Sequence, residues 1–182
     1  MPKLPSTTAK AVDKTDAIHD SGTFEPLAPG DYLARLREVS VRDNTDKYGQ
    51  TMWSVEFDDL HSVETHETAP GRQWMNLTVP LGPKKVHPSY TGTPEKWATY
   101  QNMAMGRLKA FFESFGYTTD SDTDEMLGEY AVITVRTRTI QSGPREGQLT
   151  NEVTGVKALD DAGIDDLDEY GVDLDADNEG AF

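Results

Sequence analysis

Two pairs of arginines are the residues of this sequence best suited to bind phosphate. Arg35 and Arg37 form one pair, and Arg136 and Arg138 form the other. Each pair lies in a stretch typical of a β-strand, where residues two apart point to the same face of a sheet. If the two strands are neighbours, the four side chains form one basic stripe that would attract a nucleic-acid backbone. Each pair taken alone is better explained as an ordinary solvated strand surface, and it is the joint placement of the two pairs that favours binding.

Aromatic and basic residues in the turns would add to such a surface. Single-stranded nucleic acid is held by stacking of nucleobases on aromatic side chains, at ~1–3 kcal/mol per base, inside a basic groove. Trp74 alternates with a run of apolar residues and is expected to point outward, while Tyr130 shares a strand face with the second arginine pair. The predicted nucleic-acid-binding residues are Arg35, Arg37, Lys47, Tyr48, Trp74, Tyr130, Arg136, Arg138 and Arg145.

Catalytic and metal-binding patterns are not evident. The chain has four histidines and no cysteine, which excludes disulfides and thiolate metal sites. His61 and His66 are five residues apart and lack a second ligand pair. The acidic run 120–125 lacks the glycine and glutamate of a calcium loop. The sequence therefore predicts no catalytic residue, no metal site and no cofactor.

Acidic residues are concentrated at the end of the chain. The net charge is −15, and residues 158–182 contribute ten acids and no basic residue. Such a composition predicts a solvated, mobile tail, because it offers little to bury and repels itself. A tail of this kind can compete with DNA for a basic groove and present its tip to other proteins. The predicted partner-binding residues are Asp175, Asp177, Glu179 and Phe182. No internal repeat is evident.

Alternating apolar residues predict the elements that would position these side chains. The expected strands cover residues 31–42, 51–60, 72–80, 129–140 and 149–159. A helix is expected to begin after Thr93, a favourable N-cap followed by Pro94, and to run to Phe115 before Gly116. Three strands, one helix and two strands match an OB-fold, a mainly β, five-stranded Greek-key barrel. Another small α+β sheet with one covering helix is the alternative.

The expected organisation has three parts. Residues 1–25 are predicted to be a flexible lead-in, residues 26–157 the nucleic-acid-binding domain, and residues 158–182 the disordered acidic tail. No apolar run approaches the ~20 residues of a membrane helix, and the N-terminus has no hydrophobic signal core. We therefore expect a cytoplasmic protein with no membrane partner.

Several stretches resemble known single-stranded DNA-binding proteins. The acidic end, closing on Glu-Gly-Ala-Phe at 179–182, is similar to the tails of bacterial and phage proteins of this class, although those place several Asp residues before Ile-Pro-Phe. The body resembles an uncharacterised phage family thought to bind single-stranded DNA. The similar pieces are PGDYLARLREVSV, the Lys-Tyr-Gly turn at 47–49, WSVEF, LKAFFESFGY, LGEYAVITVRTRT and NEVTGV.

The resemblance implies an OB-like fold and a role in phage DNA replication or recombination. The expected function is non-enzymatic binding of single-stranded DNA with little sequence preference, in the cytoplasm of a host cell. The tail would recruit a polymerase, helicase or recombinase, and homo-oligomers are possible. The alternatives are a DNA mimic that inhibits a host nucleic-acid enzyme, a virion structural protein and, last, a metal-dependent nuclease.

Overall fold

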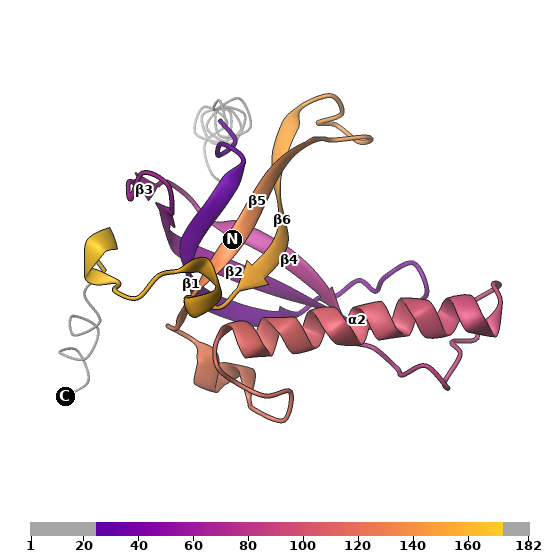
Figure 1. Cartoon of the computed structure of the whole chain (residues 1–182). Helices are drawn as coiled ribbons and strands as arrows, with labels where there is room; N and C mark the ends of the chain where they lie inside the picture. The colour runs from indigo at the N-terminus through magenta and orange to yellow at the C-terminus, as the bar shows by residue number, and fades with distance from the viewer. Residues whose placement is uncertain (1–24, 173–182) are drawn as a thin grey trace, which may run out of the picture.

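The alternating strands form one antiparallel sheet in the computed structural model, which describes residues 25–172 (Figure 1). Its strands are β1 Gly30–Val41, β2 Met52–Ser62, β3 Thr68–Ala69, β4 Gln73–Thr78, β5 Tyr130–Thr139 and β6 Leu149–Lys157. The five long strands confirm the predicted ones. The two-residue strand β3 was not predicted, because it is defined only by pairing with Leu60 and His61 of β2.

The strand order leaves the sheet with two free edges. The order is β3-β2-β1-β5-β6, and β4 pairs with β2 beside β3. The edge strands β4 and β6 approach each other, but no ladder joins them within residues 25–172. A mainly β architecture with one long helix is therefore confirmed, whereas a closed Greek-key barrel is not established.

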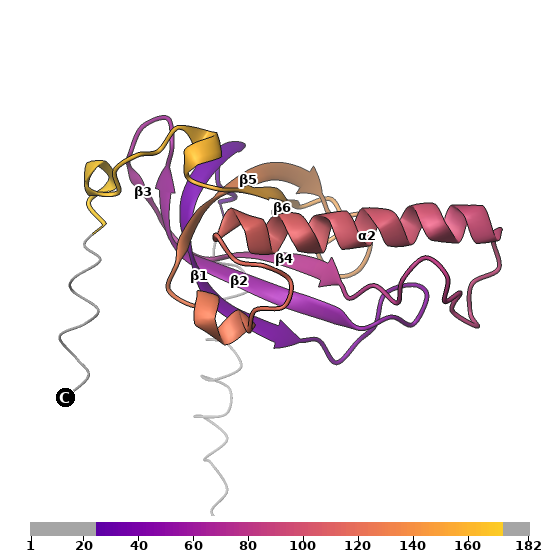
Figure 2. The same cartoon turned by 60° about the horizontal axis from the view of Figure 1, so that its bottom comes forward.

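The long helix α2, Pro94–Ser114, begins and ends as the sequence predicts. The Thr93 side chain accepts a hydrogen bond from the Lys96 amide at 3.4 Å, and Pro94 takes the first helical position. Gly116 follows the helix with a φ of 79°, a conformation that glycine adopts without steric cost. Figures 1 and 2 show the N-terminal half of α2 projecting past the sheet, beside the loops that follow β1 and β4.

A polar network ties the projecting half of α2 to both loops. The Asp46 carboxylate accepts hydrogen bonds from the amides of Tyr48 and Gln50, from the Gln50 side chain and from the Tyr100 hydroxyl, the last at 2.6 Å. Gln101 donates to Gln50 at 2.9 Å. Burial raises the pKa of Asp46, but these hydrogen bonds outweigh it and leave the pKa below its ordinary value. The loop 43–50 is thus held in one conformation.

The main core lies between the inner face of the sheet and the C-terminal half of α2. Phe111 and Phe112 of the helix are buried against Phe57 of β2, Leu77 of β4 and Ile133 of β5. The apolar face of α2 thus covers this face of the sheet.

Residues 158–172, termed here the C-terminal segment, are packed on the opposite face of the sheet. Ile164, Tyr170 and Val172 are buried against Leu33 of β1 and Val132 of β5. The prediction of a mobile tail beginning at 158 is therefore wrong for this segment. Six of its fifteen residues are acids, but the apolar residues between them are spaced so that they can face the sheet. Residues 173–182 and 1–24, with the tail and lead-in predicted there, lie outside the described residues.

The C-terminal segment contains a repeat that the sequence analysis missed. Residues 159–164 and 167–172 both read Leu, two acids, one apolar or aromatic residue, Gly and Ile or Val. Each forms a short 3₁₀ turn, Asp160–Ala162 or Asp168–Tyr170, closed by a glycine with φ near 71°. The match extends over only six residues at a spacing of eight, which is too short to stand out in a comparison of whole repeats.

No helix among the described residues is long and apolar enough to cross a membrane.

Candidate nucleic-acid interface

The register between β1 and β5 separates the two predicted arginine pairs. Arg35 lies opposite Tyr130, whereas Gly30, at the start of β1, lies opposite Val135. Arg136 therefore follows Tyr130 by six residues, or roughly 20 Å along the strand. The prediction of a single four-arginine stripe is wrong, because antiparallel pairing places the two pairs at opposite ends of the ladder.

Carboxylates of β2 neutralise the first pair. Arg35 binds Asp58 at 3.0 Å, and Arg37 binds Asp58 at 3.0 Å and Glu56 at 3.3 Å. Arg72, which precedes β4, binds Glu56 at 2.7 Å. We term these five residues the ion-pair grid. Burial raises the pKa of Asp58, but the hydrogen bonds and charges of the two arginines outweigh it, so the pKa lies below its ordinary value. A phosphate would have to displace a carboxylate to bind here.

The second pair lies on a hairpin arm formed by residues 136–152. The arm extends past the start of β1, since the ladder with β1 ends at Val135 (Figure 1). Arg136 and Arg138 are exposed and form no ion pair with any residue of the described range. Arg145, near the tip, donates a hydrogen bond to the Gln148 side chain at 3.2 Å. The arm thus presents guanidinium groups that carboxylates do not neutralise.

A groove of about 770 Å³ runs between β4, α2 and β6, and we term it the edge groove. It lies where the two free edges of the sheet approach without pairing. Trp74 of β4 and Met103 of α2 line it and are 52% and 55% exposed. Arg107 of α2 and Arg138 of β5 line it too, and Arg107 forms no ion pair within residues 25–172. Two of the predicted residues, Trp74 and Arg138, are therefore brought together.

The helix residues of the edge groove were missed by the sequence analysis. Met103, Gly106, Arg107 and Ala110 follow the spacing i, i+3, i+4 and i+7, so they share one face of α2. Helical periodicity in the sequence could have identified this face. Nothing in the helix alone indicated that its second face meets a groove beside β4 and β6.

The aromatic residues Tyr48 and Tyr130 have structural surroundings. Tyr48 is half-buried and packs edge-on against Tyr90 and Tyr100, with ring centroids 5.1 and 5.2 Å away. The exposed Lys47 places its ammonium group 4.8 Å from the centre of the Tyr48 ring. Tyr130 is buried in the cluster with the C-terminal segment, and its hydroxyl donates to Asp59. The predicted stacking on Tyr130 would therefore require the C-terminal segment to move.

The predicted partner-binding residues Asp175, Asp177, Glu179 and Phe182 lie outside the described residues.

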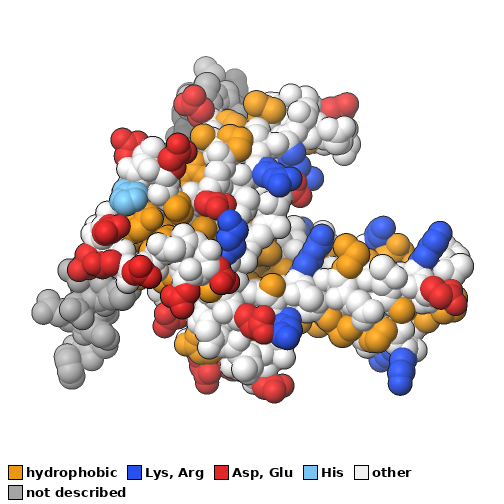
Figure 3. Space-filling view, in the orientation of Figure 1, with side chains coloured by type: hydrophobic (Ala, Val, Ile, Leu, Met, Phe, Trp, Pro, Cys, Tyr) orange, Lys and Arg blue, Asp and Glu red, His pale blue; other side chains and the backbone are white. Residues whose placement is uncertain are grey.

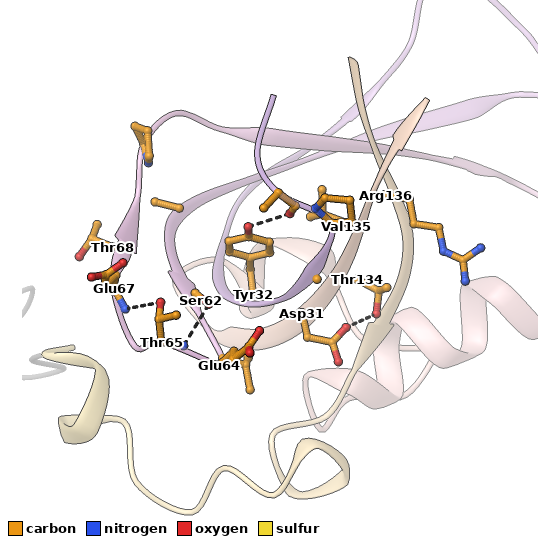
Figure 4. Close-up of a pocket in the computed structure, with 16 residues that line it drawn as sticks. Asp31, Tyr32, Ser62, Glu64, Thr65, Glu67, Thr68, Thr134, Val135 and Arg136 are labelled. Carbon is orange, nitrogen blue, oxygen red and sulfur yellow. Dashed lines mark hydrogen bonds between the residues drawn. The ribbon is translucent and has the colours of Figure 1, made fainter. Parts of the chain in front are cut away.

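A second pocket, of about 870 Å³, opens between the start of β1, the turn after β2, and β5 (Figure 4). Asp31, Glu64, Glu67 and Arg136 are among its lining residues. Hydrogen bonds from Lys157 and Thr134 to Asp31 lower the pKa of that carboxyl group below its ordinary value. Even with Lys157 paired to Asp31, Glu64 and Glu67 outnumber Arg136, and this excess of negative charge disfavours phosphate. The edge groove is therefore the better candidate for a nucleic-acid interface.

Within the part of the chain that the structure describes, no three His, Asp or Glu side chains are grouped as metal ligands. The acidic connection after α2 instead forms a 3₁₀ turn, Thr123–Met126, in which the Asp122 side chain accepts from the Asp124 amide at 3.0 Å.

Comparison with models of known protein families finds no match for this chain, and comparison with curated proteins finds none either.

Proposed function

We propose that this protein binds single-stranded DNA, with little sequence preference, through the edge groove. The observation that carries the proposal is the joint presence, in one groove, of an exposed Trp74 and of Arg138, which has no carboxylate partner among residues 25–172. A guanidinium group can bind a phosphate, and an indole can stack on any nucleobase. Bases in a duplex already stack on both faces, so an exposed indole favours an unpaired strand.

The strand order supports this reading. The long strands lie side by side in the order β4-β2-β1-β5-β6, which is third, second, first, fourth and fifth along the chain. The strands of an OB-fold lie in the same order from the third to the fifth. The helix α2 lies between the third and fourth long strands. OB-folds bind oligonucleotides on strands two and three and on the loops after strands one and four. Here β4 is the third long strand, and the hairpin arm includes the loop after the fourth. We therefore propose an OB-like fold.

The resemblance of the sequence to phage proteins supports a role in phage DNA metabolism. We propose a non-enzymatic role in phage DNA replication or recombination in the host cytoplasm. Asp175, Asp177, Glu179 and Phe182 would then contact a polymerase, helicase or recombinase, and the acids there would compete with DNA for the groove.

The test is a titration of the full chain with a fluorescein-labelled 30-nucleotide oligo-dT and with a duplex of equal length. The single strand should bind more tightly, and its affinity should fall as salt rises. Trp74→Ala should weaken binding about 5- to 150-fold, which corresponds to ~1–3 kcal/mol for one stacked base. Trp74→Phe should retain most of the affinity.

Val86→Ala is the matched control, since Val86 is an exposed apolar residue, at 44%, that does not line the groove. Equal affinities for duplex and single strand, or a Trp74→Ala variant that binds like the wild type, would contradict the proposal.

A DNA mimic is the second candidate, and one observation favours it. The six acids of the C-terminal segment are all exposed on a folded surface rather than on a loose tail. In Figure 3, acidic side chains gather over this segment, while basic ones lie along α2. A mimic would bind a basic protein and no oligonucleotide, so the same titration separates the two functions.

A further inference from the structure

The face of α2 toward the edge groove contains a glycine that packing within the chain does not require. Gly106 lies in the helix interior, where glycine is less favourable than alanine. A Cβ atom built there would meet no heavy atom from another part of residues 25–172 within 4 Å. The space beside Gly106 is therefore open groove, and a longer side chain would fill it.

The side chains around this space suit the two halves of a nucleotide. Met103 and Trp74 are about half exposed and offer polarisable apolar surface from the helix and from β4. Arg107 and Arg138 supply two positive charges, against one lining carboxylate, Glu152. A planar nucleobase with an anionic phosphate on each side matches this arrangement.

We propose that α2 forms the second wall of the nucleotide site, with one nucleobase over Gly106 between Met103 and Trp74. Arg107 and Arg138 bind the flanking phosphates. This inference rests on the proposed function and adds Met103, Gly106 and Arg107 to it. Three observations argue for a single strand as the occupant: the open space beside Gly106, the two half-exposed apolar side chains, and the lack of ion pairs at both arginines among the described residues.

The decisive variant fills the groove without weakening the fold. Gly106→Met adds a good helix former and should raise the urea midpoint of unfolding, while lowering oligo-dT affinity by about as much as the loss of one stacked base, roughly 5- to 150-fold. Gly106→Ala should also raise the midpoint but lower the affinity less than Gly106→Met does, because a methyl group fills less of the groove than a methionine side chain. Both are measured on the full chain by fluorescence anisotropy.

Charge is tested on the same helix. Arg107→Ala should weaken binding and reduce the slope of log affinity against log salt by about 0.7, the value for one phosphate contact on a single strand. Lys109→Ala is the matched control, because Lys109 is exposed, pairs with Glu113 at 3.5 Å and does not line the groove. Its slope should match that of the wild type.

The outcomes distinguish the inference from the function on which it rests. Failure of the wild type to bind oligo-dT would overturn the proposed function. Binding that is sensitive to Trp74→Ala but unchanged in Gly106→Met and Arg107→Ala would overturn only the role of α2. A change of oligomeric state in Gly106→Met, seen by sedimentation with affinity unchanged, would assign the groove to a second copy and overturn this inference.

Discussion

The arginines of the ion-pair grid and those of the edge groove differ in what neutralises them. Arg37 is 45% exposed, yet its guanidinium group binds both Asp58 and Glu56. Arg138 is also exposed but has no carboxylate partner within residues 25–172. Exposure alone would rank the two alike as phosphate ligands. The two groups of arginines thus differ in ion pairing rather than in exposure or in their position on a strand.

The largest expected effect is on stability, and it is tested by removing the Asp58 carboxylate, which Arg35 and Arg37 share. Asp58→Asn removes the negative charge that Arg35 and Arg37 share, although Arg37 keeps Glu56 at 3.3 Å, and the Asp58 side chain is only 12% exposed. Loss of one partner of a buried pair costs ~3–5 kcal/mol, and the partial exposure of the arginines reduces this to about 2 kcal/mol. Urea unfolding measures the change. An unchanged free energy of unfolding would show that the grid does not stabilise the sheet.

A smaller effect is expected on the affinity for oligo-dT. Arg138→Ala should lower oligo-dT affinity by about 1.5 kcal/mol, roughly tenfold, because it removes one charge-assisted hydrogen bond to phosphate. Arg37→Ala should lower the affinity less and the stability more. The two variants are compared by anisotropy and urea unfolding in the same buffer. An Arg37→Ala variant that binds more weakly than Arg138→Ala would reverse the assignment of the two groups.

The smallest effect concerns pH. Because the pKa of folded Asp58 is lowered, its stabilisation is complete above the unfolded value of ~3.9 and is lost as pH falls through the folded value. The gap in thermal midpoint between wild type and Asp58→Asn should stay constant from about pH 5 to 8 and narrow below about pH 4. Arg138→Ala should show no such dependence. If the difference in thermal midpoint stays constant down to about pH 2, the ionisation of Asp58 is not its cause.

The elements were predictable because their signals are local. Each signal depends on residues only a few positions apart. Examples are the alternation of apolar residues in β2, the N-cap at Thr93 and the spacing of apolar residues by three and four in α2. The sheet register and the partners of each arginine are not local. Arg35 meets Asp58 across 23 positions of sequence, so the sequence could indicate that Arg35 faces outward but not that a carboxylate would neutralise it.

The candidate site also combines local features, which the sequence predicts, with non-local ones, which it does not. The outward orientation of Trp74 followed from alternation on one strand and is confirmed by its exposure. The association of Trp74 with Arg107 depends on how a helix lies beside two sheet edges, which no single stretch encodes. The prediction of a mobile tail failed for the C-terminal segment for a different reason. It rested on the charge of the segment and not on the spacing of Ile164, Tyr170 and Val172.

The position of the C-terminal segment also has a consequence during protein synthesis. The surface that it covers is formed by Leu33 and Val132, which leave the ribosome well before Ile164 and Tyr170. A nascent chain with paired β1 and β5 therefore exposes an apolar strip to solvent until the C-terminal segment emerges. The hydrogen bonds of the two turns, such as Ile164 N–H to Leu159 at 3.0 Å, are local. The segment can fold as soon as it is released and cover the strip before other nascent chains adhere to it.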